Sequence, residues 1–178
     1  LASIPFTAIL IWTRGQQALY RALKPLDLET YLMSYEQIYK KGHISGTGLF
    51  FVKEWSVIPP YLVHCTIRSN IIYERNVLIS LVRTDDPHGL ETALNIGLAT
   101  GLDAIEIRAG YMEMLDIEGI LKTNNITEKV IFYGIEDIET SNIFWKLFST
   151  IKRQTPNFVQ FHKLPSAKLQ GVVTRVEM

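Results

Sequence analysis

Apolar and polar positions along the first 42 residues follow two different patterns. Residues 1–12 carry no charge, and three bases follow before the first acid, Asp27. Such a run is typical of a core helix, but an apolar run followed by bases also resembles the cytoplasmic end of a membrane-spanning helix. Twelve residues cannot span a bilayer, which needs about 20. A signal peptide is excluded, because its bases precede its apolar run.

Residues 28–39 repeat apolar side chains at intervals of three and four, which is the spacing of one face of a helix. Asp27 stands in the N-cap position, and Gly42 follows where helices commonly end. The pattern predicts an amphipathic connecting helix within 25–42. Its tyrosines are expected to dock on the rest of the chain or on a partner rather than to stack on a ligand.

From His43 onward, short apolar runs between turn residues predict strands, and spacings of three and four predict helices. Asp116, and either Thr140 or Ser141, are expected to cap two of the helices. Glycines 97 and 101 favour a strand with a turn over a helix. The strands are expected at 49–52, 76–82, 90–102 with its turn, 103–108, 130–133 and 171–177, and the helices at 60–69, 116–123 and from 140 or 141 until Pro156.

These elements predict an α/β or α+β body with a single mixed β-sheet of about six strands and three or four packed helices, preceded by an N-terminal helical segment. Strands and helices do not alternate strictly, so a purely parallel doubly wound sheet is not required. No repeat, low-complexity tract or linker interrupts the body.

Composition adds the size class and a charge asymmetry. The chain has 178 residues, 47% of them apolar and 20% charged, which suits a globular domain with a real core. Eighteen bases and eighteen acids cancel, which argues against a general nucleic-acid binder. The signs are unevenly spread, with six bases and three acids up to Lys53 and twelve bases and fifteen acids after it. A basic N-terminal segment therefore precedes a mildly acidic body.

Motifs for chemistry are missing from the sequence. The single cysteine, Cys65, excludes an intrachain disulfide and a cysteine-rich metal site. Four histidines lie far apart, without metal-ligand spacing. There is no G-x-S-x-G nucleophile elbow and no phosphate-binding loop of the P-loop or dinucleotide type. We therefore expect no metal, no cofactor and no enzymatic activity.

Three polar positions stand out in the first half of the body. His64 lies on the predicted helix 60–69, where a histidine held by a hydrogen bond is the ordinary interpretation and a catalytic role is the alternative. Glu74 and Arg75 directly precede the predicted strand 76–82. An ion pair or the orientation of a loop is the ordinary interpretation of both.

A series of short segments from about His43 to the end resembles, in the same order, the motifs of the KUP (HAK/KT/KUP) potassium uptake permeases. The segments are ISGTGLFF at 44–51, IPPYLVH at 58–64, IYERNVLI at 72–79, VRTDDP at 82–87, IRAGYME at 107–113, VIFYG at 130–134, WKLF at 145–148, FHKLP at 161–165 and GVVTRVE at 171–177. Two segments depart from the family pattern: residues 64–70 lack its lysine, and 134–136 lack its arginine.

The resemblance implies that this chain is the cytoplasmic C-terminal domain of a secondary potassium transporter of the plasma membrane, with K+/H+ symport carried out by the full-length protein. Residues 1–24 would be the end of the last transmembrane helix and its basic cytoplasmic flank, 25–42 the connecting helix and 43–178 the cytoplasmic domain. A start at Leu1 rather than methionine agrees with a fragment. Because transported ions bind within spanning helices, this part is expected to be regulatory or structural.

The resemblance also suggests a cyclic nucleotide effector, because some potassium uptake systems respond to cyclic di-AMP. Arg83, Arg108 and Glu113 occupy strand ends where an effector could be held, and an internal ion pair such as Arg108 with Glu113 is the alternative. The competing function is a soluble nucleotide-binding sensor for cyclic di-AMP or an adenine nucleotide, or an enzyme of unrecognised class. The expected partners are the transmembrane portion of the same transporter, K+ for the full-length protein, and a second copy bound through the helix at 28–39.

Overall fold

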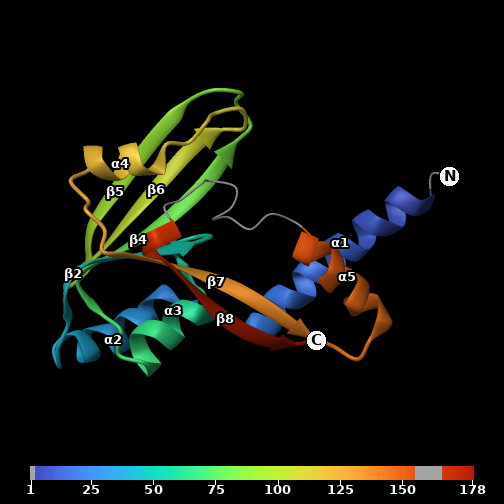
Figure 1. The fold of residues 1–178 in the computed structure, drawn as a ribbon, viewed down its shortest axis with the longest axis horizontal. Helices are drawn as coiled ribbons and strands as arrows, with labels where there is room; N and C mark the ends of the chain where they lie inside the picture. The colour runs from blue at the N-terminus through green and yellow to red at the C-terminus, as the bar shows by residue number, and fades with distance from the viewer. Residues whose placement is uncertain (1–2, 155–165) are drawn as a thin grey trace.

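A mixed six-stranded sheet organises residues 3–154 and 166–178, the parts of the chain that the computed structural model describes (Figure 1). The sheet has the order β5-β6-β4-β2-β7-β8. Its strands are β2 (Ile44–Val52), β4 (Tyr73–Thr84), β5 (Leu90–Ala99), β6 (Leu102–Gly110), β7 (Val130–Glu139) and β8 (Leu169–Glu177). Neighbouring strands are parallel except β5, which is antiparallel to β6 at one edge.

The five parallel strands have the order 3-2-1-4-5 when β2 is counted first, which is the strand order of a doubly wound sheet. The order reverses between β2 and β7, which pair in parallel from Gly48 opposite Val130 to Phe50 opposite Phe132. The prediction of one mixed sheet of about six strands with packed helices and an N-terminal helix is confirmed. The antiparallel β5 accounts for the lack of strict alternation in the sequence.

Alternate residues of the central strands fill two separate cores. Phe50 of β2 and Leu78 of β4 face α2 (Leu28–Tyr39) and α3 (Pro60–Val63). Their neighbours Leu49, Val77 and Ile79 face α4 (Ile117–Thr123) on the other side. These side chains are fully buried. Burial on both faces explains why the strands read as apolar runs.

The inner face of α2 is lined by tyrosines that bond to the body. Tyr31 donates to the Thr66 hydroxyl over 3.2 Å, and the Tyr35 hydroxyl accepts from Asn76 Nδ2 over 2.7 Å. Tyr31 and Tyr35 are fully buried. The prediction that these tyrosines dock on the chain is confirmed. The same burial removes this face as the surface on which a second copy was expected to bind.

Strands β7 and β8 extend beyond the sheet as a two-stranded arm. β7 pairs with β2 at three positions and with β8 at nine. A two-stranded ribbon is weak unless helices cover it, and here α1 (Ser3–Leu23) and α5 (Ile143–Gln154) supply the cover (Figure 1). A third apolar cluster joins the four elements and consists of Ile11, Leu19, Ile138, Phe148 and Val176.

A short antiparallel ladder connects the N-terminal segment to the loop after β2. Strand β1 (Leu26–Asp27) pairs with β3 (Val57–Ile58). Asp27 then caps α2, accepting from the Thr30 amide over 2.8 Å, as expected. The hydrogen bonds from Thr30 lower the pKa of the Asp27 carboxyl.

The predicted helix 60–69 is divided into two kinds of turn. α3 covers only its first four residues, and a π-helical segment, η1 (His64–Arg68), continues it to a C-cap at Ser69. The turn predicted after residue 90 is confirmed, since Gly101, at φ +68°, separates β5 from β6. A second short helix, η2 (Ser166–Lys168), leads into β8.

Several predicted boundaries are wrong. β4 begins at Tyr73 and ends at Thr84, because β2 and β6 provide partners beyond its apolar centre. Arg83, expected in a loop, is therefore in the strand. The N-cap of α5 is neither Thr140 nor Ser141 but Asn142, whose Oδ1 accepts from the Phe144 amide over 2.9 Å. The expected end at Pro156 lies outside the described residues.

Candidate functional site

The place where a doubly wound sheet usually binds its ligand is filled by a side chain of this chain. Ligands of such sheets lie outside the carboxyl ends of the strands where the strand order reverses. Here Tyr61 of α3, only 3% exposed, occupies that point beside β2 and β7. Its hydroxyl donates to the Phe51 carbonyl, and a Cβ on Gly134 would lie 2.7 Å from its ring. Burial raises the pKa of Tyr61 far above its ordinary value, so the hydroxyl stays a donor.

The six polar positions singled out in the sequence lie in three separate places. His64 is on the π-helical segment, and the other five lie near the two ends of β4. Glu74 and Arg75 are at the beginning of that strand, and Arg83 is at its far end. Arg83 lies eight positions after Arg75 along the strand, or about 26 Å at a strand rise of about 3.3 Å. One ligand of nucleotide size cannot contact all six.

At the beginning of β4, the polar groups hold loops in place. Arg75 Nε lies 3.0 Å from Asp103 Oδ2, and the other carboxylate oxygen accepts from the Gly97 amide over 2.9 Å. Glu74 accepts weakly from the Gly46 amide over 3.4 Å. These contacts match the ordinary interpretation of an ion pair and oriented loops.

His64 and Cys65 do not form a thiolate–imidazole pair. The Cys65 side chain is buried in the core between α2, α3 and the sheet, whereas His64 is exposed. Burial raises the pKa of the Cys65 thiol to about 11. A thiol with this pKa stays protonated at neutral pH and is a poor nucleophile.

At the far end of β4, Arg83 clamps the chain that leaves β6. Its Nη1 donates to the Gly110 carbonyl over 2.8 Å and to the Glu113 carbonyl over 3.0 Å. The Glu113 carboxylate accepts from the Gly89 amide over 3.3 Å and lies 3.6 Å from His88 Nδ1. The arginine therefore holds backbone, and the glutamate holds the preceding loop.

Arg108 does not join this clamp. It pairs with Val82 across the ladder and thus shares the face of β4 opposite to Arg83. Its Nε lies 2.7 Å from Glu106 Oε1, and that ion pair raises the pKa of the guanidinium. The expected partner, Glu113, instead contacts Gly89 and His88 in the loop 85–89. The specific pairing of Arg108 with Glu113 is therefore wrong.

Two loops cross at the clamp and form one hydrogen-bonded unit, which we call the loop platform (residues 85–89 and 110–114). The Gly110 amide donates to Gly89, and those of Tyr111 and Met112 donate to Asp86 and Pro87, over 2.9 to 3.0 Å. A Cβ on Gly110 would lie 2.7 Å from the Pro87 backbone. The crossing therefore requires glycine at position 110.

The loop platform carries apolar side chains that face solvent. Tyr111 and Met112 are each 60% exposed, and Met114 is 92% exposed. No motif in the sequence marked these side chains as a contact surface, although apolar residues inside a charged loop are a readable signal. An exposed cluster of this kind commonly marks a contact surface.

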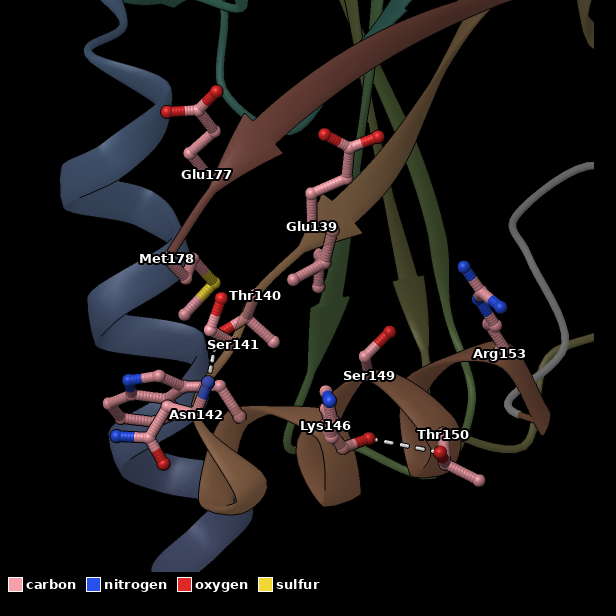
Figure 2. Close-up of a pocket in the computed structure, with 12 residues that line it drawn as sticks. Glu139, Thr140, Ser141, Asn142, Lys146, Ser149, Thr150, Arg153, Glu177 and Met178 are labelled. Carbon is pink, nitrogen blue, oxygen red and sulfur yellow. Dashed lines mark hydrogen bonds between the residues drawn. The ribbon is translucent and has the colours of Figure 1, made fainter.

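A second candidate is the hollow between the ends of β7 and β8 and the start of α5 (Figure 2). Glu139 and Glu177 border it from the strands, and Lys146 and Arg153 border it from α5. Arg153 is paired with Asp137 at 3.2 Å, and Glu139 with Arg175 at 3.1 Å. Two of these four charged side chains, Arg153 and Glu139, are therefore already engaged in ion pairs with residues outside this set. Within the described residues, no group of three side chains could hold a metal ion.

Comparison with known proteins identifies the family. The sequence model of the "K+ potassium transporter C-terminal domain" matches residues 45–178. The chain belongs to this family. The matched region contains the whole sheet except Ile44, and with it the loop platform. The resemblance to KUP permeases noted in the sequence is thereby confirmed.

Several relatives match over all of the chain. A "Probable potassium transport system protein Kup" of Pelobacter propionicus is 73% identical over 178 residues, and a "Kup 3" of Geobacter sulfurreducens is 71% identical. A Kup protein of the archaeon Methanosarcina acetivorans is 48% identical over 179 residues. In each case the match covers 100% of this chain but only 29% or 30% of the relative.

The chain thus spans less than a third of the relatives it matches, and α1 and α2 are matched along with the family domain. Among the described helices, none combines the length and the apolar character needed to cross a membrane. No solved structure is similar to this chain.

Proposed function

We propose that this chain is the cytoplasmic C-terminal domain of a KUP-family potassium transporter, whose full-length protein imports K+ with protons across the plasma membrane. The observation that carries the proposal is the match of the entire chain to proteins named potassium transport system protein Kup. Ion binding and movement belong to the transmembrane portion, which would be this domain's partner.

We propose further that the domain has a structural and regulatory role and no catalytic one. Tyr61 fills the usual ligand position, and the Cys65 thiol is held protonated. α1 is packed on α5 and on the β7–β8 arm. A displacement of α1 would therefore be transmitted to the arm and the sheet. Residues 1–24 would join the last span to this domain.

The transport proposal is tested with the full-length gene in a strain that lacks its own potassium uptake. We expect growth at low external K+ and uptake of K+ or Rb+ that falls when the proton gradient is collapsed. Absence of K+-dependent rescue, with the protein present in the membrane, would overturn the transport assignment. Uptake that ignores the proton gradient would overturn symport alone.

The placement of the domain is tested by cysteine labelling of intact cells. A single cysteine is introduced in place of Ile96, which is 75% exposed, while the native Cys65 is buried and slow to react. We expect an impermeant maleimide to label Ile96→Cys only after the cells are permeabilised. Labelling of intact cells would place the domain outside.

The role of the domain is tested by deleting residues 43–178 from the full-length protein. A structural role predicts loss of the protein from the membrane, and a regulatory role predicts normal abundance with an altered dependence of uptake on K+. If abundance and uptake are both unchanged, the domain has neither role.

The nucleotide-sensor alternative gains no support from the geometry, because Tyr61 occupies the switch point and the arginines 83 and 108 lie on opposite faces. Calorimetry of the full-length protein with cyclic di-AMP and adenine nucleotides tests it, and saturable heat would revive it. A homodimer stays a prediction that needs a surface other than the buried face of α2, and sedimentation of the full-length protein tests it.

A further inference from the structure

A patch of exposed apolar side chains lies at the carboxyl ends of β4 and β6. Tyr111, Met112 and Met114 protrude from the loop platform, and Leu90, at the start of β5, is about half exposed beside them. Leu90 is opposite Ala109 in the ladder, directly before the crossing at Gly110. Clustered large apolar side chains are uncommon on the free surface of a domain and commonly mark an interaction site.

The patch stands on backbone that is fixed before any partner arrives. Arg83 holds the carbonyls of Gly110 and Glu113, and amides of residues 110–112 donate to carbonyls of the loop 85–89. Ordering a loop costs conformational entropy. Here the ordered loops hold Tyr111, Met112 and Met114 in solvent rather than burying them. A preorganised apolar surface loses less entropy on binding than a flexible one.

The surroundings of the patch are acidic. Residues 82–92 and 108–122 contain six carboxylates, two arginines and Lys122, which pairs with Glu118 at 2.8 Å, a net charge of −3 with His88 neutral. Arg83 is directed to backbone carbonyls and Arg108 to Glu106. Asp85, Asp86 and Glu91 are exposed. The outward field at this end of the sheet is therefore negative, which favours a basic partner.

The patch is directed toward the side from which α1 enters the domain. In Figure 1, the arrowheads of β4 and β6 and the N-terminal end of α1 all point to the upper right. The matched relatives contain more than twice as much chain outside this domain as within it. For a family domain described as C-terminal, that remaining chain would precede α1. The strand ends that carry the patch thus point to the side on which the rest of the transporter would attach.

We propose that the loop platform docks on the basic cytoplasmic loops of the transmembrane portion of the same transporter. The inference rests on the proposed function. Cytoplasmic loops of membrane proteins carry an excess of Lys and Arg, which complements the acidic rim. Flexible, polarisable methionines suit an irregular loop surface.

The same charge argues against two other occupants. Anionic headgroups of the cytoplasmic leaflet attract basic rather than acidic surfaces, so a lipid surface is disfavoured. Two copies joined patch to patch would bring like charges together. Both are distinguishable outcomes of the test.

The test uses the full-length transporter in its native membrane. A photoreactive benzoylphenylalanine is placed at Met112 or Met114, and at Ile96 as a matched control, which is also exposed and apolar but lies at the opposite end of the strands. We expect adducts from positions 112 and 114 to peptides of the cytoplasmic loops, with a yield about tenfold above the Ile96 position, as for a contact worth about 1.4 kcal/mol.

Adducts to lipid only, to the platform of a second copy, or to this domain alone would overturn the proposal, as would equal yields at all three positions. Potassium uptake by the unmodified protein is measured in parallel. Uptake without loop adducts would reject the docking proposal and leave the transport proposal intact. Loop adducts without uptake would support the docking proposal and reject the transport proposal.

A second measurement removes the contact without the probe. The double variant Met112→Ser/Met114→Ser should expose the loops, so that cysteines introduced there react about tenfold faster with a soluble maleimide. The double variant to leucine should restore protection, and Ile96→Ser should change nothing. Unchanged loop reactivity in the serine variant, at normal abundance of the protein, would overturn the proposal.

Discussion

Gly15 of α1 lies directly against the ring of Phe148 of α5, at a distance that leaves no room for a Cβ. Phe148 is fully buried, and its ring is also tilted against Trp12 at a centroid distance of 5.8 Å. The N-terminal helix is therefore fitted to the body at one glycine. This contact makes α1 a packed part of the arm rather than a free tether.

Replacing Gly15 with valine should separate α1 from α5. Overpacking a filled contact costs about 1–3 kcal/mol, and the loss should appear as a lower melting temperature and faster proteolysis within α1. Gln17→Val is the matched control, because it introduces the same side chain at an exposed position of the same helix. Equal effects of the two substitutions would show that the Gly15 contact is unimportant.

Replacing Tyr61 with phenylalanine should destabilise the domain without changing its shape. The variant keeps the ring against Gly134 but leaves the buried Phe51 carbonyl without its hydroxyl donor. Loss of one intramolecular hydrogen bond costs about 0.5–1.5 kcal/mol. Denaturant unfolding measures this loss. Tyr111→Phe, which changes an exposed hydroxyl, should be neutral, and a neutral Tyr61→Phe would contradict the assigned bond.

Stability should fall as the pH rises above 9. Burial raises the pKa of Cys65 from 9.0 to about 11, and the pKa values of Tyr31, Tyr35 and Tyr61 also lie above their ordinary 10.0. Unfolded chains lose these protons first, so the stabilisation is complete below pH 9 and is lost as the pH passes through the folded-state values. Unfolding measured from pH 8 to 11 checks the sign. Cys65→Ala should flatten the part of the decline that begins near pH 9.

Replacing Arg83 with alanine should loosen the loop platform while leaving the sheet intact. Two hydrogen bonds to backbone carbonyls disappear, so amide exchange of residues 110–113 should accelerate. Arg83→Lys should be intermediate, because it keeps the charge but lacks the planar donor geometry. Arg108→Ala, on the opposite face, is the control. Unchanged exchange in Arg83→Ala would show that the clamp does not hold the loops.

Local sequence patterns predicted most of the secondary structure and the mixed sheet. They did not predict how the candidate site residues are arranged. Capping by Asp27 and the glycine turn at Gly101 depend on neighbouring residues and were predicted. The prediction of the α5 cap was wrong because Thr140, Ser141 and Asn142 are all suitable N-cap residues in sequence. Only the path of the backbone selects Asn142. Arg108 and Glu113 are close in sequence and opposite in charge, but the alternation of β6 directs the arginine to the other face.

Residue order alone was enough to identify the types of the elements, the family, and a single cysteine that cannot form an intrachain disulfide, because each depends on composition or on the identity of neighbours. The tertiary structure alone decided the strand order, the place of Tyr61 at the switch point and the exposure of Met112 and Met114. These features depend on contacts between residues far apart in the chain, where the free energy of the whole sheet selects one pairing. The loop platform belongs to the second group, since its two loops are brought together by the pairing of β5 with β6.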